Sequence, residues 1–221
     1  IPDVMITSSQ DRCDYLAERG FLAHRVPIWH ASLLRETPPP NNAGDERDID
    51  VLFIGAQSLR HRNETVQEIK DAGINIVSLG DYNKDNLWGE ERDHLIRRTK
   101  IFLNLQRYPV TLPGLRFLIG MTNRAMIVSD PLYQPLPYVS GEHLIEAPRA
   151  ELSATLRRFL DDHAAREHIA NSGYEFAKTM TPRRLMTKII DHLEARYEEY
   201  AICKSAGRTF VRGAKLQKRS A

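Results

Sequence analysis

The chain has 221 residues, of which 42% are hydrophobic and 27% charged, and its 31 Lys and Arg residues against 29 Asp and Glu leave a net charge of +2. These values are typical of an ordinary globular protein with one large domain, or one domain and part of another. The balanced charge points to no particular charged partner for the body of the protein. No apolar run approaches the ~20 residues of a membrane span, which excludes a transmembrane helix in this sequence.

The two cysteines, Cys13 and Cys203, lie far apart and do not form the closely spaced pair of a metal site. Reduced thiols in a cytoplasmic protein are the expected state, with a disulfide as the alternative. The sequence has no signal peptide and begins at Ile1, inside a strand-like segment. We therefore expect a fragment or a processed form of a longer protein.

The first part of the chain combines short strands with one helix. Strand-like segments are expected at 4–7 and 24–27, and the apolar spacing between them predicts a helix at 10–18 that ends before Gly20. The segment 37–45 contains three prolines and few apolar residues. That composition predicts a stiff, solvated linker.

From residue 49 onward, apolar strand-like segments alternate with amphipathic helical ones. Strands are expected at 49–55, 74–79, 100–105 and 125–129, and helices between them at 63–72, 90–98 and around 115–119. This alternation predicts an α/β fold with a doubly wound parallel sheet that helices cover on both faces. Residues 151–200 are predicted to be almost entirely helical, which adds a helical C-terminal segment.

The first strand of this sheet ends at Gly55, and two arginines, Arg60 and Arg62, follow near the expected start of a helix. Ligands of doubly wound folds bind at the carboxyl ends of the strands. Glycine lets a ligand approach the backbone there, and a helix N-terminus offers N–H groups to a phosphate. The segment therefore predicts an anion site, and its alternative interpretation is a tight turn before a solvated basic helix.

Arg116 lies just inside a helix that begins near Pro113 and follows a buried strand. The start of such a helix is expected to face the same cleft, where an arginine can neutralise a phosphate group. The alternative is a surface arginine bonded to a neighbouring carboxylate. Among the scattered histidines, His30 follows Trp29 at an expected hinge and is a candidate base, although a structural histidine is the more common role.

The order of segments between residues 100 and 190 resembles the nucleotide-sugar-binding half of GT-B glycosyltransferases, especially the spore-maturation-type (CgeB-like) group. The resemblance rests on the strand at 100–105, the string Arg116-Phe-Leu-Ile119, the strand Ile127-Val-Ser129 and the later segment Tyr138-Val-Ser-Gly-Glu-His143. It covers roughly residues 49–200, with a weaker part at 1–30.

The resemblance implies two Rossmann-like domains with the active site between them, and transfer of a sugar from a nucleoside-diphosphate sugar to an acceptor that it does not define. The chain would then comprise a remnant of the N-terminal, acceptor-binding domain at 1–35, a linker at 36–48, the nucleotide-sugar-binding domain at 49–200 and a basic tail at 201–221. The resemblance implies no cofactor and no bound metal ion.

The resemblance also implies donor-binding or phosphate-binding roles for individual residues. These are Gly55, Arg60, Arg116, Ser129, Asp130 and Glu142. Arg116 and Arg60 would stabilise the diphosphate leaving group together with a helix N-terminus. Asp130 would either reach the donor or cap a turn, and Glu142 or the adjacent His143 would contact the donor near a turn.

Two positions depart from the family pattern. The glutamate that related enzymes use to bind the donor ribose appears here as Ile119, which cannot accept a hydrogen bond, and a small glycine step appears as Asn123-Arg124. Either the alignment is shifted, the donor is held differently, or the donor site has decayed. Two alternatives to a glycosyltransferase therefore remain. One is a non-catalytic GT-B-like interaction or regulatory module, and the other is a different nucleotide-binding doubly wound protein.

The segment from Lys204 to Arg219 contains basic residues and no acidic ones. Such a tail either binds an anionic partner, such as a membrane surface or nucleic acid, or serves as a solubilising terminus.

Overall fold

The structure, a computed structural model, describes residues 5–21, 23–25, 47–56, 58–80, 89–108, 114–195, 208–209 and 217–218. The chain divides into two compact units, one formed by residues 30–179 and the other by residues 1–29 together with 180–221. His30, most of the predicted linker at 36–48 and most of the basic tail lie outside the described residues. The predicted acceptor-domain remnant and the boundaries at 35, 48 and 200 stay predictions.

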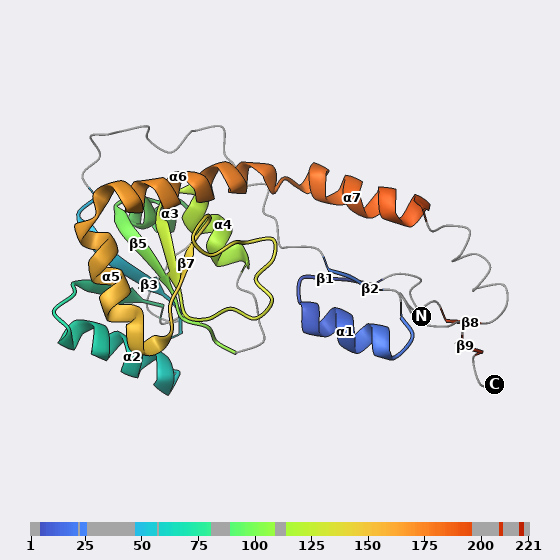
Figure 1. Cartoon of the computed structure of the whole chain (residues 1–221), viewed down its shortest axis with the longest axis horizontal. Helices are drawn as coiled ribbons and strands as arrows, with labels where there is room; N and C mark the ends of the chain where they lie inside the picture. The colour runs from blue at the N-terminus through green and yellow to red at the C-terminus, as the bar shows by residue number, and fades with distance from the viewer. Residues whose placement is uncertain are drawn as a thin grey trace. The chain divides into compact units, whose positions relative to one another are not determined.

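The larger unit is built on a parallel sheet that includes β3, β5 and β7 (Figure 1). Its five strands lie in the order β4-β3-β5-β6-β7. Its strands are β3 (Ile49–Ile54), β4 (Ile76–Leu79), β5 (Thr99–Asn104), β6 (Met126–Ser129) and β7 (Ile145–Glu146). Every neighbouring pair of strands is parallel. The predicted doubly wound parallel sheet is confirmed, and the four predicted strands match the observed ones to within about two residues.

Helices connect the strands and cover the sheet. They are α2 (Arg60–Asp71), α3 (Gly89–Arg97), α4 (Gly114–Thr122), α5 (Leu152–Asp161) and α6 (His163–Thr179), with a short 3-10 turn η2 (Arg149–Glu151) before α5. The connection from β3 to β4 runs through α2, and the one from β5 to β6 runs through α4. The predicted alternation of strands and helices is therefore the observed one.

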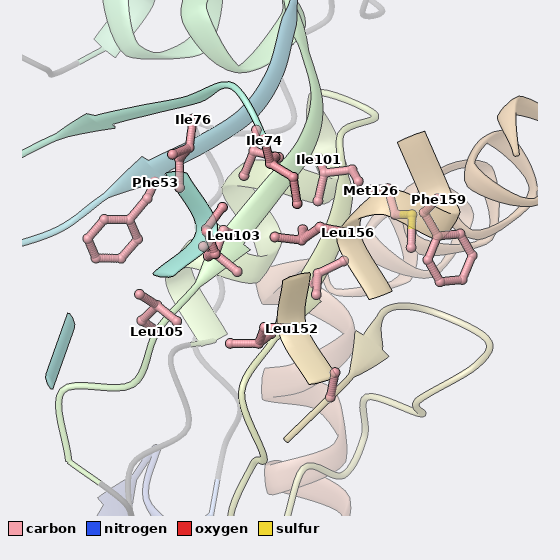
Figure 2. Close-up of a cluster of buried hydrophobic side chains, with 14 of the residues drawn as sticks. Phe53, Ile74, Ile76, Ile101, Leu103, Leu105, Met126, Leu152, Leu156 and Phe159 are labelled. Atoms are coloured by element: carbon pink, nitrogen blue, oxygen red, sulfur yellow. The ribbon is translucent and has the colours of Figure 1, made fainter. Parts of the chain in front are cut away.

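One face of the sheet packs against α2 and α5. Figure 2 shows Phe53 of β3, Leu103 of β5 and Met126 of β6 gathered with Leu156 and Phe159 of α5. Alternate residues of a strand point to the same face, so every second position of each strand contributes to this layer. Burying each of these side chains stabilises the fold by about 1.5–3 kcal/mol.

The opposite face packs closely against α4. A Cβ atom on Gly120 would stand 2.8 Å from side-chain atoms of both Phe102 and Ile127. Gly120 therefore lets α4 approach the sheet at a distance that any larger residue would prevent. This close packing fixes where the start of α4, and with it Arg116, lies relative to the strand ends.

The smaller unit contains β1 (Met5–Thr7), α1 (Gln10–Glu18), β2 (Ala23–Arg25), α7 (Pro182–Ala195) and the short pair β8 (Arg208–Thr209) and β9 (Gln217–Lys218). β1 and β2 pair in parallel across α1, which matches the predicted strand–helix–strand order. Taking all helices that the structure describes, none combines the length and apolar character required to cross a membrane.

Candidate functional site

The strand order places a topological switch point between β3 and β5. The chain goes from β3 to β4 on one side and then returns to β5 on the other side of β3. In open α/β sheets, the connections on either side of such a point diverge, and ligands bind outside the carboxyl ends of the strands there. The residues that follow β3, β5 and β6 are therefore the ones to consider as a site.

Gly55, the residue after β3, lies where two arginine side chains converge. A Cβ atom at this position would stand 2.9 Å from Cζ of Phe53, and 3.3 Å from both Nη1 of Arg62 and Nη2 of Arg116. Arg62 comes from α2 on one face of the sheet, and Arg116 comes from the start of α4 on the other. The backbone at Gly55 is thus closely approached by the Phe53 ring and by two guanidinium groups.

Both arginines are tethered to the end of β5. Nη2 of Arg62 donates to the backbone oxygen of Leu105 at 2.6 Å, and Nη1 of Arg116 donates to Oδ1 of Asn104 at 2.6 Å. Both guanidinium groups also lie near the ring of Phe53, at 5.6 and 5.8 Å from its centroid, within the range of cation–π attraction. In each guanidinium, one Nη therefore donates to the end of β5 and the other Nη lies over Gly55.

Arg62 is deeply buried, with only 4% of its surface exposed. Burial lowers the pKa of Arg62, an effect that Asp130 opposes and Arg107 reinforces. Arginine nevertheless stays protonated in proteins, so a buried positive charge remains next to Gly55. Such a charge is costly unless an anion compensates it.

Ser129, the last residue of β6, and Asp130, which follows it, lie beside this pair of arginines. The two carboxylate oxygens of Asp130 accept from the backbone N–H of Gln106, each at 3.0 Å. Burial raises the pKa of Asp130, while the hydrogen bond from Gln106 and the charges of Arg62, His61 and Arg116 act in the opposite direction. Asp130 thus links the ends of β5 and β6 close to the two cations.

The starts of α2 and α4 add positive charge to this edge. The first turn of α2 contains Arg60, His61 and Arg62 without an acid, and no side chain caps it. The first turn of α4 also lacks acidic residues and contains Arg116. α3, in contrast, starts with Glu90 and Glu91, the arrangement that the helix dipole favours. Cations at a helix start are unfavourable unless an anion binds there, so this edge is suited to an anionic ligand.

The structure brings four of the six predicted site residues together at the strand ends, whereas Arg60 is exposed in the first turn of α2 and Glu142 lies in the turn before β7. Gly55, Arg116, Ser129 and Asp130 follow or border the strand ends described above. The side chain of Arg60 is 92% exposed and pairs with Glu64 one turn further along α2, at 2.6 Å. For Arg60, as for the other five residues, donor binding stays a prediction.

Glu142 lies in the turn before β7 and is exposed. Its carboxylate is 3.4 Å from Nε2 of His143, whose ring stacks on Phe176 and whose Nδ1 accepts from the N–H of Val139. Burial lowers the pKa of His143, and the charge of Glu142 partly offsets this. These contacts give His143 a structural role, and donor binding by Glu142 stays a prediction.

The positions that depart from the family pattern have distinct environments. Ile119 is a buried side chain of α4. Arg124 has φ +52°, in the left-handed region that favours glycine, and it closes the end of α4 through its N–H, which donates to the oxygen of Met121 at 3.0 Å. The family's glycine near this position is therefore explained by the left-handed backbone, which glycine adopts without strain. Arg124 adopts the same conformation at a cost in conformational energy.

Asn104 was not predicted from the sequence, and Arg60 was favoured over Arg62 as the arginine that contacts the diphosphate. Asn104 is fully buried at the end of β5, directly after the apolar run Ile101, Phe102 and Leu103. A polar residue next to such a run is the signal that would have identified it, since buried polar groups need a partner. Among the described residues, no three His, Cys, Asp or Glu side chains are grouped so as to hold a metal ion.

A family model described as glycosyl transferase-like matches residues 60–191, more than half of the chain. The chain belongs to this glycosyl transferase-like family. The matched region contains both convergent arginines, the end of β5 and the end of β6. No curated protein matches the chain in sequence.

Solved structures of glycosyltransferases share the fold of this family member. The Anabaena protein HepE, whose structure was solved in complex with UDP and glucose, matches with a TM-score of 0.63 and 11% identity over 88% of this chain. The lipopolysaccharide-biosynthesis glycosyltransferase WaaG matches with a TM-score of 0.59 and 15% identity over 85% of this chain. These likenesses show a Rossmann-like domain of the GT-B type, corresponding to the C-terminal domain.

The chain spans only part of these proteins. It covers 64% of HepE, 61% of WaaG and 45% of the pneumococcal O-GlcNAc transferase GtfA, which matches with a TM-score of 0.55 and 11% identity over 90% of this chain.

Proposed function

We propose that the chain is the donor-binding half of a glycosyltransferase and that it binds a nucleoside-diphosphate sugar with the diphosphate over Gly55. The observation that carries this proposal is the convergence of Arg62 and Arg116, from helices on opposite faces, over a glycine at the switch point of the sheet. Guanidinium groups bind phosphate oxygens through two parallel N–H groups, and two of them match the charge of a diphosphate. The complex of the fold neighbour HepE with UDP supports this choice of ligand.

The arrangement suits sugar transfer because negative charge develops on the diphosphate as it leaves. When the acceptor oxygen attacks the anomeric carbon, the bond to the leaving oxygen breaks and its electrons pass to the diphosphate. Arg62, Arg116 and the starts of α2 and α4 are aimed at that charge in a partly buried site, where electrostatic stabilisation is strong. The two guanidinium groups supply this charge without a metal ion.

The proposal also includes the group of GT-B enzymes to which the chain is assigned. The strings Arg116-Phe-Leu-Ile119 and Ile127-Val-Ser129 support the spore-maturation-type (CgeB-like) group. In a GT-B enzyme the acceptor and the catalytic base come largely from the other domain. This chain is therefore proposed to supply the donor site, and the acceptor stays undefined.

Calorimetric titration of the full chain with UDP and GDP tests the proposal, with uridine and guanosine as phosphate-free controls. Arg116→Ala is expected to weaken nucleoside-diphosphate binding roughly tenfold to a hundredfold, because a hydrogen bond to a charged group contributes about 1.5–3 kcal/mol. Arg98→Ala is the matched control: it removes the same charge from an exposed ion pair with Asp48 at the opposite edge of the sheet. Its affinity is expected to equal that of the wild type.

Two outcomes would contradict the proposal. Equal UDP affinity for wild type and Arg116→Ala would remove the arginine from the diphosphate site. Absence of any nucleoside-diphosphate binding by the wild type would favour the alternative, a non-catalytic GT-B-like module, with the buried Ile119 in place of a ribose-binding glutamate as its cause. The same titration in EDTA and in Mg²⁺ should give equal affinities, and a strict Mg²⁺ requirement would refute metal-independent binding.

A further inference from the structure

We infer that Asn104 is a positioning residue that aims Arg116 at the diphosphate, and that Ser129 acts by holding Asn104 rather than by contacting the donor. This inference rests on the proposed function, because it assigns a role within the same site. It concerns a contact chain from the end of β6 to the start of α4: Ser129, Asn104, Arg116.

The orientation of the Asn104 amide is determined by its neighbours. Nδ2 of Asn104 donates to Oγ of Ser129 at 2.8 Å, and that hydroxyl in turn donates to the backbone oxygen of Asp130 at 2.7 Å. Because the hydroxyl proton is already used, Oγ can only accept from Asn104, which requires the NH₂ group on that side. Oδ1 is therefore presented to Arg116, whose Nη1 donates to it at 2.6 Å. A flipped amide would place two donors against a guanidinium.

The burial of this chain of contacts makes it rigid. Asn104 and Ser129 are both fully buried, and they lie opposite each other in the register of β5 and β6. The hydroxyl of Ser129 is shielded from solvent and already makes both bonds described above. A fully satisfied buried polar network fixes one arrangement of its members, because any other leaves a polar group unpaired. Ser129 is thus placed to support Asn104 and not to bind a ligand.

The two arginines differ in how they are held, and this gives Asn104 a specific effect. The tether of Arg62 is a backbone oxygen, that of Leu105, which a side-chain substitution does not remove. Arg116 donates instead to the side chain of Asn104 at 2.6 Å and to the oxygen of Leu105 at 3.5 Å. Removing the Asn104 amide should therefore take the shorter of these two bonds from Arg116 and leave the bond of Arg62 in place. An arginine that is held less firmly has to be ordered when the ligand binds, which lowers affinity.

A double-mutant cycle with UDP separates positioning from a general structural role. Asn104→Ala is expected to weaken UDP binding about three- to tenfold in the wild type, the cost of ordering one long side chain, and to have no further effect in the Arg116→Ala background. Ser129→Ala should show the same pattern with a smaller loss, and it serves as the second variant where Asn104→Ala fails to fold. A structural defect would instead weaken binding by the same factor in both backgrounds.

A ligand-free measurement keeps this inference distinguishable from the proposed function. The Nε–Hε resonance of Arg116, assigned by its loss in Arg116→Ala, should be sharp in the wild type and broadened or shifted in Asn104→Ala, while that of Arg62 stays unchanged. If the wild type binds UDP but the cycle is additive, or the Arg116 resonance does not respond, the positioning role is overturned and the proposed function stands. If the wild type binds no UDP, the proposed function fails and the assignment of a diphosphate as target fails with it.

Discussion

The parallel sheet has an amino edge, where its strands begin, and a carboxyl edge, where they end. Positively charged side chains have different hydrogen-bond partners at these two edges. At the amino edge, Arg98 forms an ion pair with Asp48, and Lys100 forms one with Asp50 at 2.6 Å. At the carboxyl edge, Arg62 and Arg116 donate to uncharged oxygens of the β5 end. A hydrogen bond to an uncharged acceptor orients a guanidinium without adding a counter-charge, and the nearby Asp130 supplies a carboxylate whose charge acts on both arginines. The carboxyl edge, where two guanidinium groups converge, is therefore the one at which we propose that an anion binds.

Helix ends reinforce the contrast. Arg47, at the amino edge, donates to the oxygens of Thr99 and Arg124, the latter at the carboxyl end of α4. A cation is favourable there, because the helix dipole makes that end negative. Arg62 and Arg116 instead lie in the first turns of α2 and α4, where the dipole opposes them. The same residue type thus stabilises the fold at one edge and is proposed to bind the ligand at the other.

The largest effect is expected from removing both cations of the carboxyl edge. Arg62→Gln combined with Arg116→Ala should weaken UDP binding roughly a hundredfold or more, since two charge-assisted contacts are lost. Glutamine at position 62 keeps a donor for the oxygen of Leu105. The matched double variant at the amino edge, Arg98→Ala with Lys100→Ala, should bind UDP like the wild type in the same calorimetric titration. Equal losses in the two double variants would show that only net charge matters.

A side chain at position 55 tests whether the site needs the close approach of the two arginines to the backbone there. Gly55→Ala places a Cβ 2.9 Å from Phe53 and 3.3 Å from each guanidinium, so the ring and the arginines have to move. We expect about tenfold weaker UDP binding, on the scale of one lost charge-assisted contact. Urea denaturation controls for folding. Wild-type affinity in the Gly55→Ala variant would place the diphosphate away from this glycine.

Removing the negative charge beside the arginines should strengthen binding. Asp130→Asn keeps an acceptor for the N–H of Gln106 but removes the charge that acts on Arg62 and Arg116, so UDP affinity should rise about threefold at pH ~7.5. Because folding raises the pKa of Asp130, its ionised form destabilises the folded state above that pKa, and the variant should not be less stable at neutral pH. The gain should shrink as the pH falls toward the raised pKa. A large loss of affinity would instead support donor binding by Asp130.

The smallest effect is expected from substituting Arg124, which lies at the amino edge of the sheet just after the end of α4. Arg124→Gly and Arg124→Ala both remove the stacking of the guanidinium on Tyr174, at 4.4 Å from the ring centroid. Only glycine adopts the left-handed backbone at φ +52° without strain. The free energy of unfolding of Arg124→Gly, measured by urea denaturation, should therefore exceed that of Arg124→Ala by about 1 kcal/mol. UDP affinity should be the same in both variants. A more stable alanine variant would contradict the backbone explanation.

The choice between Arg60 and Arg62 shows where sequence reasoning ends. Both follow Gly55 and both were candidates for the anion site. Residues two positions apart on a helix are rotated by about 200° around its axis, so the two side chains point in nearly opposite directions. Which of them points toward the strand ends depends on the face that α2 packs on the sheet, through residues such as Val66 and Ile69. Arg62 is consequently buried beside Gly55 and Arg60 pairs with Glu64 at the surface.

The sequence by itself determined the strands, their parallel arrangement and the edge at which Gly55 and Arg116 meet. Apolar runs separated by helices specify a doubly wound sheet, and in such a sheet all carboxyl ends share one edge. Only the tertiary structure decided that Asn104 tethers Arg116 and that Ser129 supports Asn104. Those contacts join residues of neighbouring strands and a helix, and their geometry depends on strand register and on the close approach of α4 that Gly120 permits.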